Sequence, residues 1–281
     1  MTQDSDSEII TRLNEEGRQR GLPSRFLDFY TRLLSIQLKA ERSITLPKPE
    51  LGKEEAKERN EGGLPLLKFD ELALDKNLMQ STLAEVAALF ADFPDLFGKM
   101  PGPGDIGEIP IEAIRAWFDG AKLPAMQMTG EVDEEILETI IHASLKPFLV
   151  SHARVLIKLV NQESWRRQYC PVCGGKPDFS LLDKERGSRW LICSRCDSEW
   201  LFQRLQCPYC GTQDQNVLSF FPDEGGLYRL YVCDKCHTYI KAMDSRKIEA
   251  KVLPSLERVL TLDLDRQGKE KCYRPGYSEN R

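Results

Sequence analysis

The chain has 281 residues, of which 41% are hydrophobic and 30% charged, with a net charge of -5 and a pI near 5.5. This composition is typical of a globular protein of about two domains and excludes the disordered and fibrous classes. The acidic balance disfavours a general nucleic-acid binder, because neutralising phosphates requires a basic surface. The cysteine-rich stretch 165–246 holds twelve Lys/Arg against ten Asp/Glu, so no basic patch is expected there either.

The N-terminal stretch MTQDSDSEII is acidic and lacks the basic, apolar and small-residue regions of a secretory signal. The most apolar long segment, 140–160, is interrupted by charged residues, two histidines and Pro147, so we expect no membrane span. The sequence therefore predicts a cytoplasmic protein that does not associate with a membrane.

The part of the chain before Cys170 contains no cysteine and shows helical periodicity. Apolar residues recur every three or four positions, which predicts helices over 7–19, 24–41, 79–93, 110–118 and 132–160. Pro147 is expected to kink or divide the last helix. Proline, glycine and charge in 46–63 predict a long exposed loop, to which the sequence assigns no role, and 98–107 reads as a second irregular break.

Beyond Cys170 the pattern changes to short β-prone runs separated by polar turns. The predicted strands are 179–182, 189–193 and 200–202, and the same plan recurs at 217–221, 227–232 and 239–241. We interpret this as an internal duplication of one small β unit. A last helix is expected within 253–268, packed back onto the first domain, followed by a mobile polar tail.

The predicted fold is therefore α+β, a mostly helical N-terminal domain followed by two tandem small β units of rubredoxin or zinc-ribbon type. The predicted divisions are a helical domain at 1–164, a first four-cysteine unit at 165–204, a second at 205–245, and a C-terminal segment at 246–281.

Eight of the nine cysteines form four Cys-x-x-Cys pairs. They are Cys170/Cys173, Cys193/Cys196, Cys207/Cys210 and Cys233/Cys236. In a reducing compartment such pairs favour metal ligation or redox chemistry over disulfides. The cysteine spacing is Cys-x2-Cys-x19-Cys-x2-Cys in the first unit and Cys-x2-Cys-x22-Cys-x2-Cys in the second. Both match or lie close to the pattern of four-thiolate metal sites. The sequence therefore predicts two tandem metal sites.

Each Cys-x-x-Cys pair with its turn is called a knuckle below. The sequences of the four knuckles indicate which cysteines share an ion. The first and third knuckles read CPxCG, with Gly174 and Gly211 suited to a turn of positive φ. The second and fourth follow β-prone runs. Each half thus carries one of each type, which favours pairing in sequence over a cross-braced arrangement of the first knuckle with the third.

Several alternatives for these sites stay open. Each metal can serve as a structural staple or as a redox centre, and four thiolates accommodate zinc or a single iron. A thioredoxin-like redox pair is disfavoured, because these pairs lie at hairpin turns rather than at helix N-termini. We expect His237 to lie beside a site as a non-ligand, His142 and His152 to be ordinary helix residues, and Cys272 to be an incidental surface thiol.

The knuckles RRQYCPVCGGKPDF, LICSRCDSEW, QCPYCG and YVCDKCHTYIKAMD, placed behind a helical domain that contains LKPFL, resemble the FdhE-type formate dehydrogenase accessory proteins. The resemblance covers nearly the whole chain. It implies a cytoplasmic maturation factor, not an enzyme, that is needed for active formate dehydrogenase and binds the catalytic subunit before its export. It also implies rubredoxin-type iron held by the eight paired cysteines.

The sequence leaves two other functions open. One is a zinc-ribbon nucleic-acid-binding module, which the charge balance disfavours. The other is a stand-alone rubredoxin-like electron-transfer protein, for which a helical domain of this size is unnecessary. The sequence leaves open whether two copies associate as a homodimer.

Overall fold

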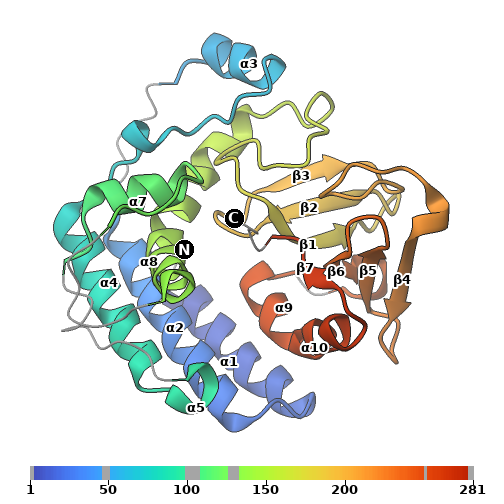
Figure 1. Cartoon of the computed structure of the whole chain (residues 1–281), viewed down its shortest axis with the longest axis horizontal. Coiled ribbons are helices and arrows are strands. Elements are labelled where there is room, and N and C mark those ends of the chain that lie inside the picture. Colours follow the sequence, from blue (N-terminus) through green and yellow to red (C-terminus); the bar gives the residue numbers. More distant parts are fainter. Residues whose placement is uncertain (1–2, 46–50, 99–107, 126–132, 250–251, 278–281) are drawn as a thin grey trace. The chain divides into compact units, whose positions relative to one another are not determined.

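The computed structural model describes residues 3–45, 51–98, 108–125, 133–249 and 252–277, with the backbone alone for residues 3–6. The chain forms two compact units (Figure 1). The helical unit comprises Met1–Lys48 and Leu67–His152, and the cysteine unit comprises Pro49–Leu66 and Ala153–Arg281. The chain therefore crosses between the units three times, and a segment from early in the sequence belongs with the cysteines.

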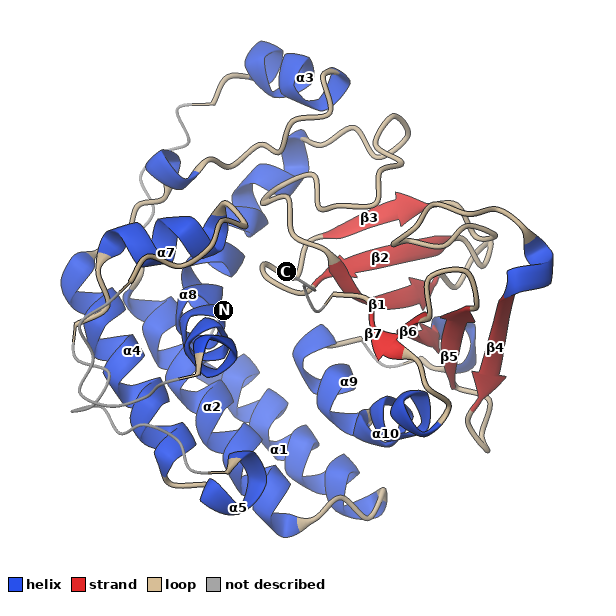
Figure 2. Ribbon diagram, viewed as in Figure 1, coloured by secondary structure: helices blue, strands red, loops and turns tan. Residues whose placement is uncertain are grey.

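The helical unit confirms the helices predicted from periodicity (Figure 2). Its elements are α1 (Gln3–Gln19), α2 (Ser24–Ser43), the 3-10 turn η1 (Phe69–Glu71), α4 (Lys76–Ala91), α5 (Pro94–Phe97), α7 (Ile111–Phe118) and α8 (Glu134–Leu156). The last residues of α8 belong to the cysteine unit and lead into the 3-10 turn η2 (Ile157–Leu159). The predicted break near residue 102 and the predicted start of the last helix at Val132 lie outside the described residues.

Aromatic packing holds α2 against α4 and against the turn that follows α4. The Phe29 ring contacts Phe90 and Phe93 edge to face, with centroids 5.1 and 5.3 Å apart. Such pairs contribute beyond the area they bury. In α8, Leu145, Phe148 and Leu149 are fully buried, and the helix continues through Pro147 rather than dividing there.

Among the described residues, the helical stretch Glu134–Leu159 alone is long and apolar enough to cross a membrane. Of its most apolar window, 67% is buried inside the protein. That burial is typical of a core helix, so length and composition are weak evidence for a span.

The cysteine unit is built on one mixed sheet. Its strands are β1 (Pro177–Leu182), β2 (Arg189–Cys193), β3 (Glu199–Phe202), β4 (Leu218–Pro222), β5 (Tyr228–Cys233), β6 (Thr238–Asp244) and β7 (Arg274–Pro275), with 3-10 turns η3 (Gln215–Val217) and η4 (Ser245–Lys247). The order is β3-β2-β1-β6-β5-β4, and β7 pairs with β6. Each predicted strand is confirmed to within a few residues.

The two duplicated halves are fused within this sheet. Each half is a three-stranded antiparallel meander, and the two meanders meet where β1 pairs in parallel with β6, with Ser180 opposite Ala242. Local patterning predicted the meanders but not this seam.

The C-terminal segment forms two helices, α9 (Pro254–Leu260) and α10 (Leu262–Glu270), rather than one. Leu264 of α10 belongs to the buried cluster of the sheet together with Phe179, Leu230 and Tyr239. The segment expected to pack onto the helical domain therefore packs on the sheet.

Two expected irregular regions differ from prediction. The predicted loop 46–63 contains α3 (Lys53–Glu61), in which Ala56, Arg59 and Asn60 are buried, while residues 46–50 lie outside the described part. The tail expected to be mobile has defined structure up to Tyr277, because β7 pairs with β6 and the Tyr273 hydroxyl donates to Asp234.

Candidate metal centres

All four Cys-x-x-Cys knuckles share one turn geometry. The residue after the second cysteine has a positive φ in each: +74° at Gly174, +73° at Gly211, +57° at Asp197 and +53° at His237. The predicted role of the two glycines is thus confirmed. The sequence did not predict that Asp197 and His237 take the same conformation, because neither residue type requires it.

The backbone of three knuckles also directs N–H groups at sulfur. The N–H groups of Val172, Arg195 and Tyr209 donate to Sγ of the cysteine two positions earlier, at 3.3, 3.4 and 3.5 Å. Hydrogen bonds of this kind stabilise thiolates, the form that binds metal.

The first sulfur group joins Cys170, Cys173, Cys193 and Cys196. The Sγ atoms of Cys170 and Cys196 are 3.5 Å apart, as are those of Cys173 and Cys193. All four residues are buried, none more than 4% exposed. The knuckles of the first half therefore converge on one enclosed point.

The second sulfur group joins Cys207, Cys210, Cys233 and Cys236. Its Sγ distances are 3.7 Å between Cys207 and Cys236 and between Cys210 and Cys233. Cys210 is exposed and Cys236 partly so, whereas the other two are buried. The grouping in both halves follows the sequence and is not cross-braced.

These distances fit a four-thiolate metal site. Within each group the sulfurs lie within 4.8 Å of one another. A tetrahedral ion with metal–sulfur bonds of about 2.3 Å places its sulfurs about 3.8 Å apart, whereas a disulfide requires about 2.0 Å. The two tetracysteine groups could each hold one metal ion, and the metal is not determined by this geometry.

Burial disfavours the thiolate form of enclosed cysteines in both groups. Burial raises the pKa of Cys170 well above its ordinary value, and hydrogen bonds with the other three thiols raise it further. In the second group, burial raises the pKa of Cys207 to about 11. Four thiolates are compatible with such burial only when a positive ion offsets their charge.

Residues 63–66, which follow α3, pack on the first knuckle and form a cover over it. The Leu66 N–H donates to the Pro171 carbonyl at 2.9 Å, and the Tyr169 hydroxyl donates to the Gly63 carbonyl at 2.8 Å. Leu66 itself is fully buried. Gly63, the last residue of the region 46–63 to which the sequence assigned no role, and the following residues up to Leu66 therefore pack on the first knuckle.

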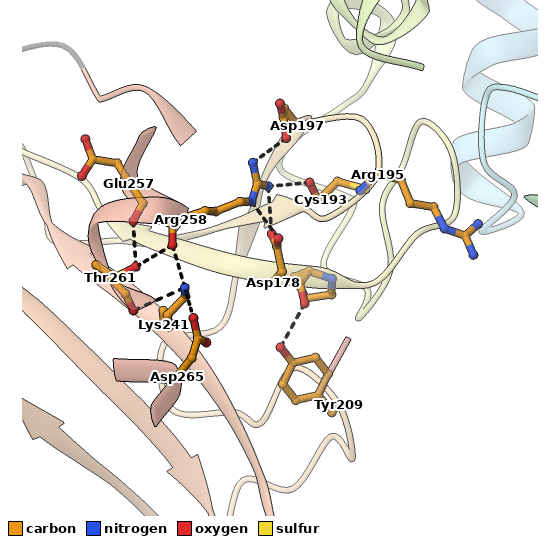
Figure 3. A network of polar contacts seen from close by, with 11 residues as sticks. Asp178, Cys193, Arg195, Asp197, Tyr209, Lys241, Glu257, Arg258, Thr261 and Asp265 are labelled. Atoms are coloured by element: carbon orange, nitrogen blue, oxygen red, sulfur yellow. Dashed lines mark hydrogen bonds and ion pairs between the residues drawn. The ribbon is translucent and has the colours of Figure 1, made fainter. Parts of the chain in front are cut away.

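Arg258 of α9 ties the helix to the same site (Figure 3). It donates from Nε and Nη2 to the two carboxylate oxygens of Asp178 at 2.7 and 2.8 Å, from Nη1 to Asp197 at 2.7 Å, and to the Cys193 carbonyl at 2.8 Å. Burial disfavours the charged guanidinium, but the two carboxylates more than offset this and raise the pKa of Arg258. Sequence analysis missed this residue, whose partners lie 61 to 80 positions away.

The remaining candidates contribute no ligand atom to either sulfur group among the described residues. His237 is exposed and contributes no ligand atom to the second group, and Cys272 is exposed and belongs to neither. His142 stacks on Trp117, with centroids 5.3 Å apart, and His152 is buried within α8. That the eight paired cysteines ligate metal stays a prediction, with a geometry that suits it.

The chain is similar to known proteins in the region of these sites. A family model described as "FdhE, central domain" matches residues 169–204, the first half of the duplication. The "Protein FdhE homolog" of Aquifex aeolicus is 33% identical over 146 residues, 50% of each chain. The "Protein FdhE homolog" of Shewanella oneidensis is 37% identical over 106 residues, 37% of this chain and 35% of that protein.

The match thus spans half or less of the length of these curated relatives. A solved structure, "The crystal structure of the FdhE protein from Pseudomonas aeruginosa", shares the fold with a TM-score of 0.64, at 20% identity, over 98% of this chain and 95% of that one. The chain is therefore similar to FdhE proteins in sequence over up to half of its length, and it shares the fold of a solved FdhE structure.

Proposed function

We propose that this protein is an accessory factor for the formation of active formate dehydrogenase. It binds the catalytic subunit of that enzyme in the cytoplasm and carries two metal ions on its cysteine unit. It acts on its client by binding and has no catalytic site of its own. The observation that carries the proposal is the pair of tetracysteine groups in a chain similar to FdhE proteins.

The residues present fit this role. The cysteine meanders are small, and a four-thiolate ion contributes about 10–16 kcal/mol of binding free energy, enough to fix the knuckles of such a unit. When bound, iron supplies one-electron redox chemistry, whereas zinc supplies a staple alone. The chain itself holds the sulfurs, directs N–H groups at them and, at the first site, excludes solvent. We favour iron, which the family resemblance implies.

The proposal is tested with the double variant Cys170→Ser and Cys207→Ser, which removes one ligand from each group. We expect it to lose bound metal, measured by elemental analysis, and cells that depend on it to lose formate dehydrogenase activity. Cys272→Ser is the matched control, because this thiol is exposed and outside both groups. It should retain metal and activity.

Full dehydrogenase activity in cells whose double variant has lost its metal would remove the metal sites from the function. The absorption spectrum of protein purified without added metal separates the two ions. Colour together with iron supports a redox role, and colourless protein with zinc supports a scaffold role.

A further inference from the structure

A cavity of about 290 Å³ lies in the cysteine unit beside the second sulfur group. Cys207 and Cys233 form part of its wall, and the sheet forms most of the rest. Leu230 of β5 belongs to the buried cluster that includes Leu264 of α10. Because side chains alternate along a strand, Arg229 and Tyr231 point to the opposite face, where they line the cavity.

The cavity is positively charged in an acidic protein. Three arginines line it, Arg189, Arg204 and Arg229, and no aspartate or glutamate is among the described residues of the lining, although Asp244 binds Arg229 from outside it. The whole chain carries a net charge of -5. The residues that line the cavity are therefore locally basic, opposite in sign to the net charge of the chain.

Arg189, from β2, is the unusual member of this set. Its side chain is buried, at 3% exposure. Nη1 donates to the Gln206 carbonyl at 3.2 Å, but Nε and Nη2 have no hydrogen-bond partner among the described residues. These two N–H groups share one edge of the planar guanidinium, the edge that binds a carboxylate through two parallel hydrogen bonds.

The surroundings of Arg189 offset its charge only in part. The Tyr231 ring lies 5.0 Å from its guanidinium carbon, a cation–π contact. The Cys207 sulfur also lines the cavity but accepts neither of these N–H groups. Asp244, which binds Arg229 at 2.8 Å, is already shared with Arg246 at 2.6 Å. A buried cation with two unfilled donors is costly unless an anion completes it.

Apolar side chains border the charged wall. Leu205 and Phe220 also line the cavity, and they are 57% and 46% exposed. The Phe220 ring lies 5.3 Å from Tyr231 and 5.0 Å from the Arg229 guanidinium. A ligand that suits this site has a carboxylate next to an apolar group.

We infer that this cavity binds an acidic peptide segment of a partner protein. One carboxylate accepts hydrogen bonds from Nε and Nη2 of Arg189, and a neighbouring apolar side chain packs on Phe220 and Leu205. The inference rests on the proposed function for the source of the peptide, which is the client subunit. A single carboxylate suits one buried guanidinium. A polyanionic nucleic acid, in contrast, is repelled by the net negative charge of the chain.

The test is a binding titration of the purified full chain, followed by fluorescence anisotropy. The probe is a labelled peptide of alternating glutamate and leucine with both ends blocked, and the matched probe has glutamine in place of glutamate. We expect the glutamate peptide to bind and the glutamine peptide to bind much more weakly. Arg189→Met should weaken binding of the glutamate peptide by about tenfold or more, as loss of a charge-assisted hydrogen-bond pair does.

Arg186→Met is the control, because Arg186 lies exposed in the turn between β1 and β2 and should leave affinity unchanged. Circular dichroism checks that the Arg189 variant is folded. Should that variant fail to fold, Phe220→Ala and Leu205→Ser, at exposed positions, should each weaken binding several-fold.

Three results would overturn the inference: equal affinity for the two peptides, unchanged affinity in Arg189→Met or in both apolar variants, and tighter Arg189-dependent binding of a single-stranded oligonucleotide than of the glutamate peptide. Because this readout is independent of dehydrogenase activity, its failure leaves the proposed function standing.

Discussion

At the scale of single residues, His152 shows how a buried titratable group couples folding to pH. Its Nδ1 donates to the Phe148 carbonyl at 2.8 Å, and its Nε2 accepts from the Ala73 N–H at 3.1 Å. Both bonds need the neutral ring, because a proton on Nε2 would remove the acceptor. Burial lowers the pKa of His152, and the bond to Phe148 opposes that shift only in part.

The sign of the pH effect follows from this lowered pKa. As pH falls, the unfolded chain takes up the histidine proton before the folded chain does, so protonation favours unfolding. We expect the free energy of unfolding to fall between about pH 7.5 and about pH 5. In His152→Asn the fall should be smaller, although that variant is less stable at neutral pH. Urea titrations at the two pH values measure the difference.

An identical pH dependence in the parent and in His152→Asn would show that this imidazole is not the sensor.

At the scale of elements, Arg258 is the contact by which α9 supports the first sulfur group. Arg258→Met removes the partner of Asp178 and Asp197, which are 13% and 22% exposed at their side chains. Breaking a largely buried ion pair from one side costs about 3 kcal/mol. We expect a loss of about that size in the free energy of unfolding, measured by urea denaturation of the metal-loaded protein.

Arg266→Met is the matched control on α10. Arg266 is 76% exposed and lies 3.9 Å from Glu270, so its removal should change stability by less than about 0.5 kcal/mol. Similar losses in the two variants would mean that Arg258 contributes no more than a surface charge.

The elements also show what the sequence could predict. The helices of the helical unit and the hairpins of the cysteine unit have local periods or turn residues, so their bounds were predicted closely. The sulfur groups were predicted because each knuckle is four residues long and its spacing is typical of metal sites. The Arg258 contacts, the β1–β6 seam and the Leu66 cover were not predicted, since they join residues dozens of positions apart and leave no local pattern.

One misprediction has a specific physical cause. The sequence of α3, KEEAKERNE, is almost wholly charged and polar, so it shows no apolar face and was interpreted as a loop. Its buried residues are Ala56 and the polar Arg59 and Asn60. Arg59 donates to the Leu66 carbonyl at 2.7 Å, and Asn60 donates to the Ala56 carbonyl within the helix at 2.7 Å. Hydropathy patterns cannot report a helix whose buried side is mostly polar.

At the scale of the whole molecule, the two sulfur groups are duplicated in sequence but differ in how far solvent reaches them. All four cysteines of the first group are buried, whereas in the second group Cys210 is exposed and Cys236 is partly exposed. We expect a chelator to remove metal in two phases, the second site first. The metal content remaining after each phase and the thiols that a colorimetric reagent then detects give the order.

Two single variants show which sulfur group gives rise to each phase of metal removal. Cys210→Ser should abolish the fast phase and leave the protein folded with one metal equivalent. Cys173→Ser should abolish the slow phase and lower the thermal midpoint more, because the first group lies within the buried part of the unit. Release of both ions in one phase would contradict the difference in access.

The cover over the first site also has a consequence for the order in which the protein assembles during synthesis. Gly63 and the Tyr169 that binds it are 106 positions apart, and nearly all of the chain between them belongs to the other unit. A ribosome releases the cover long before it makes the knuckle beneath it. The nascent helical unit can therefore complete its fold before the ribosome has made the part of the cysteine unit on which residues 63–66 pack.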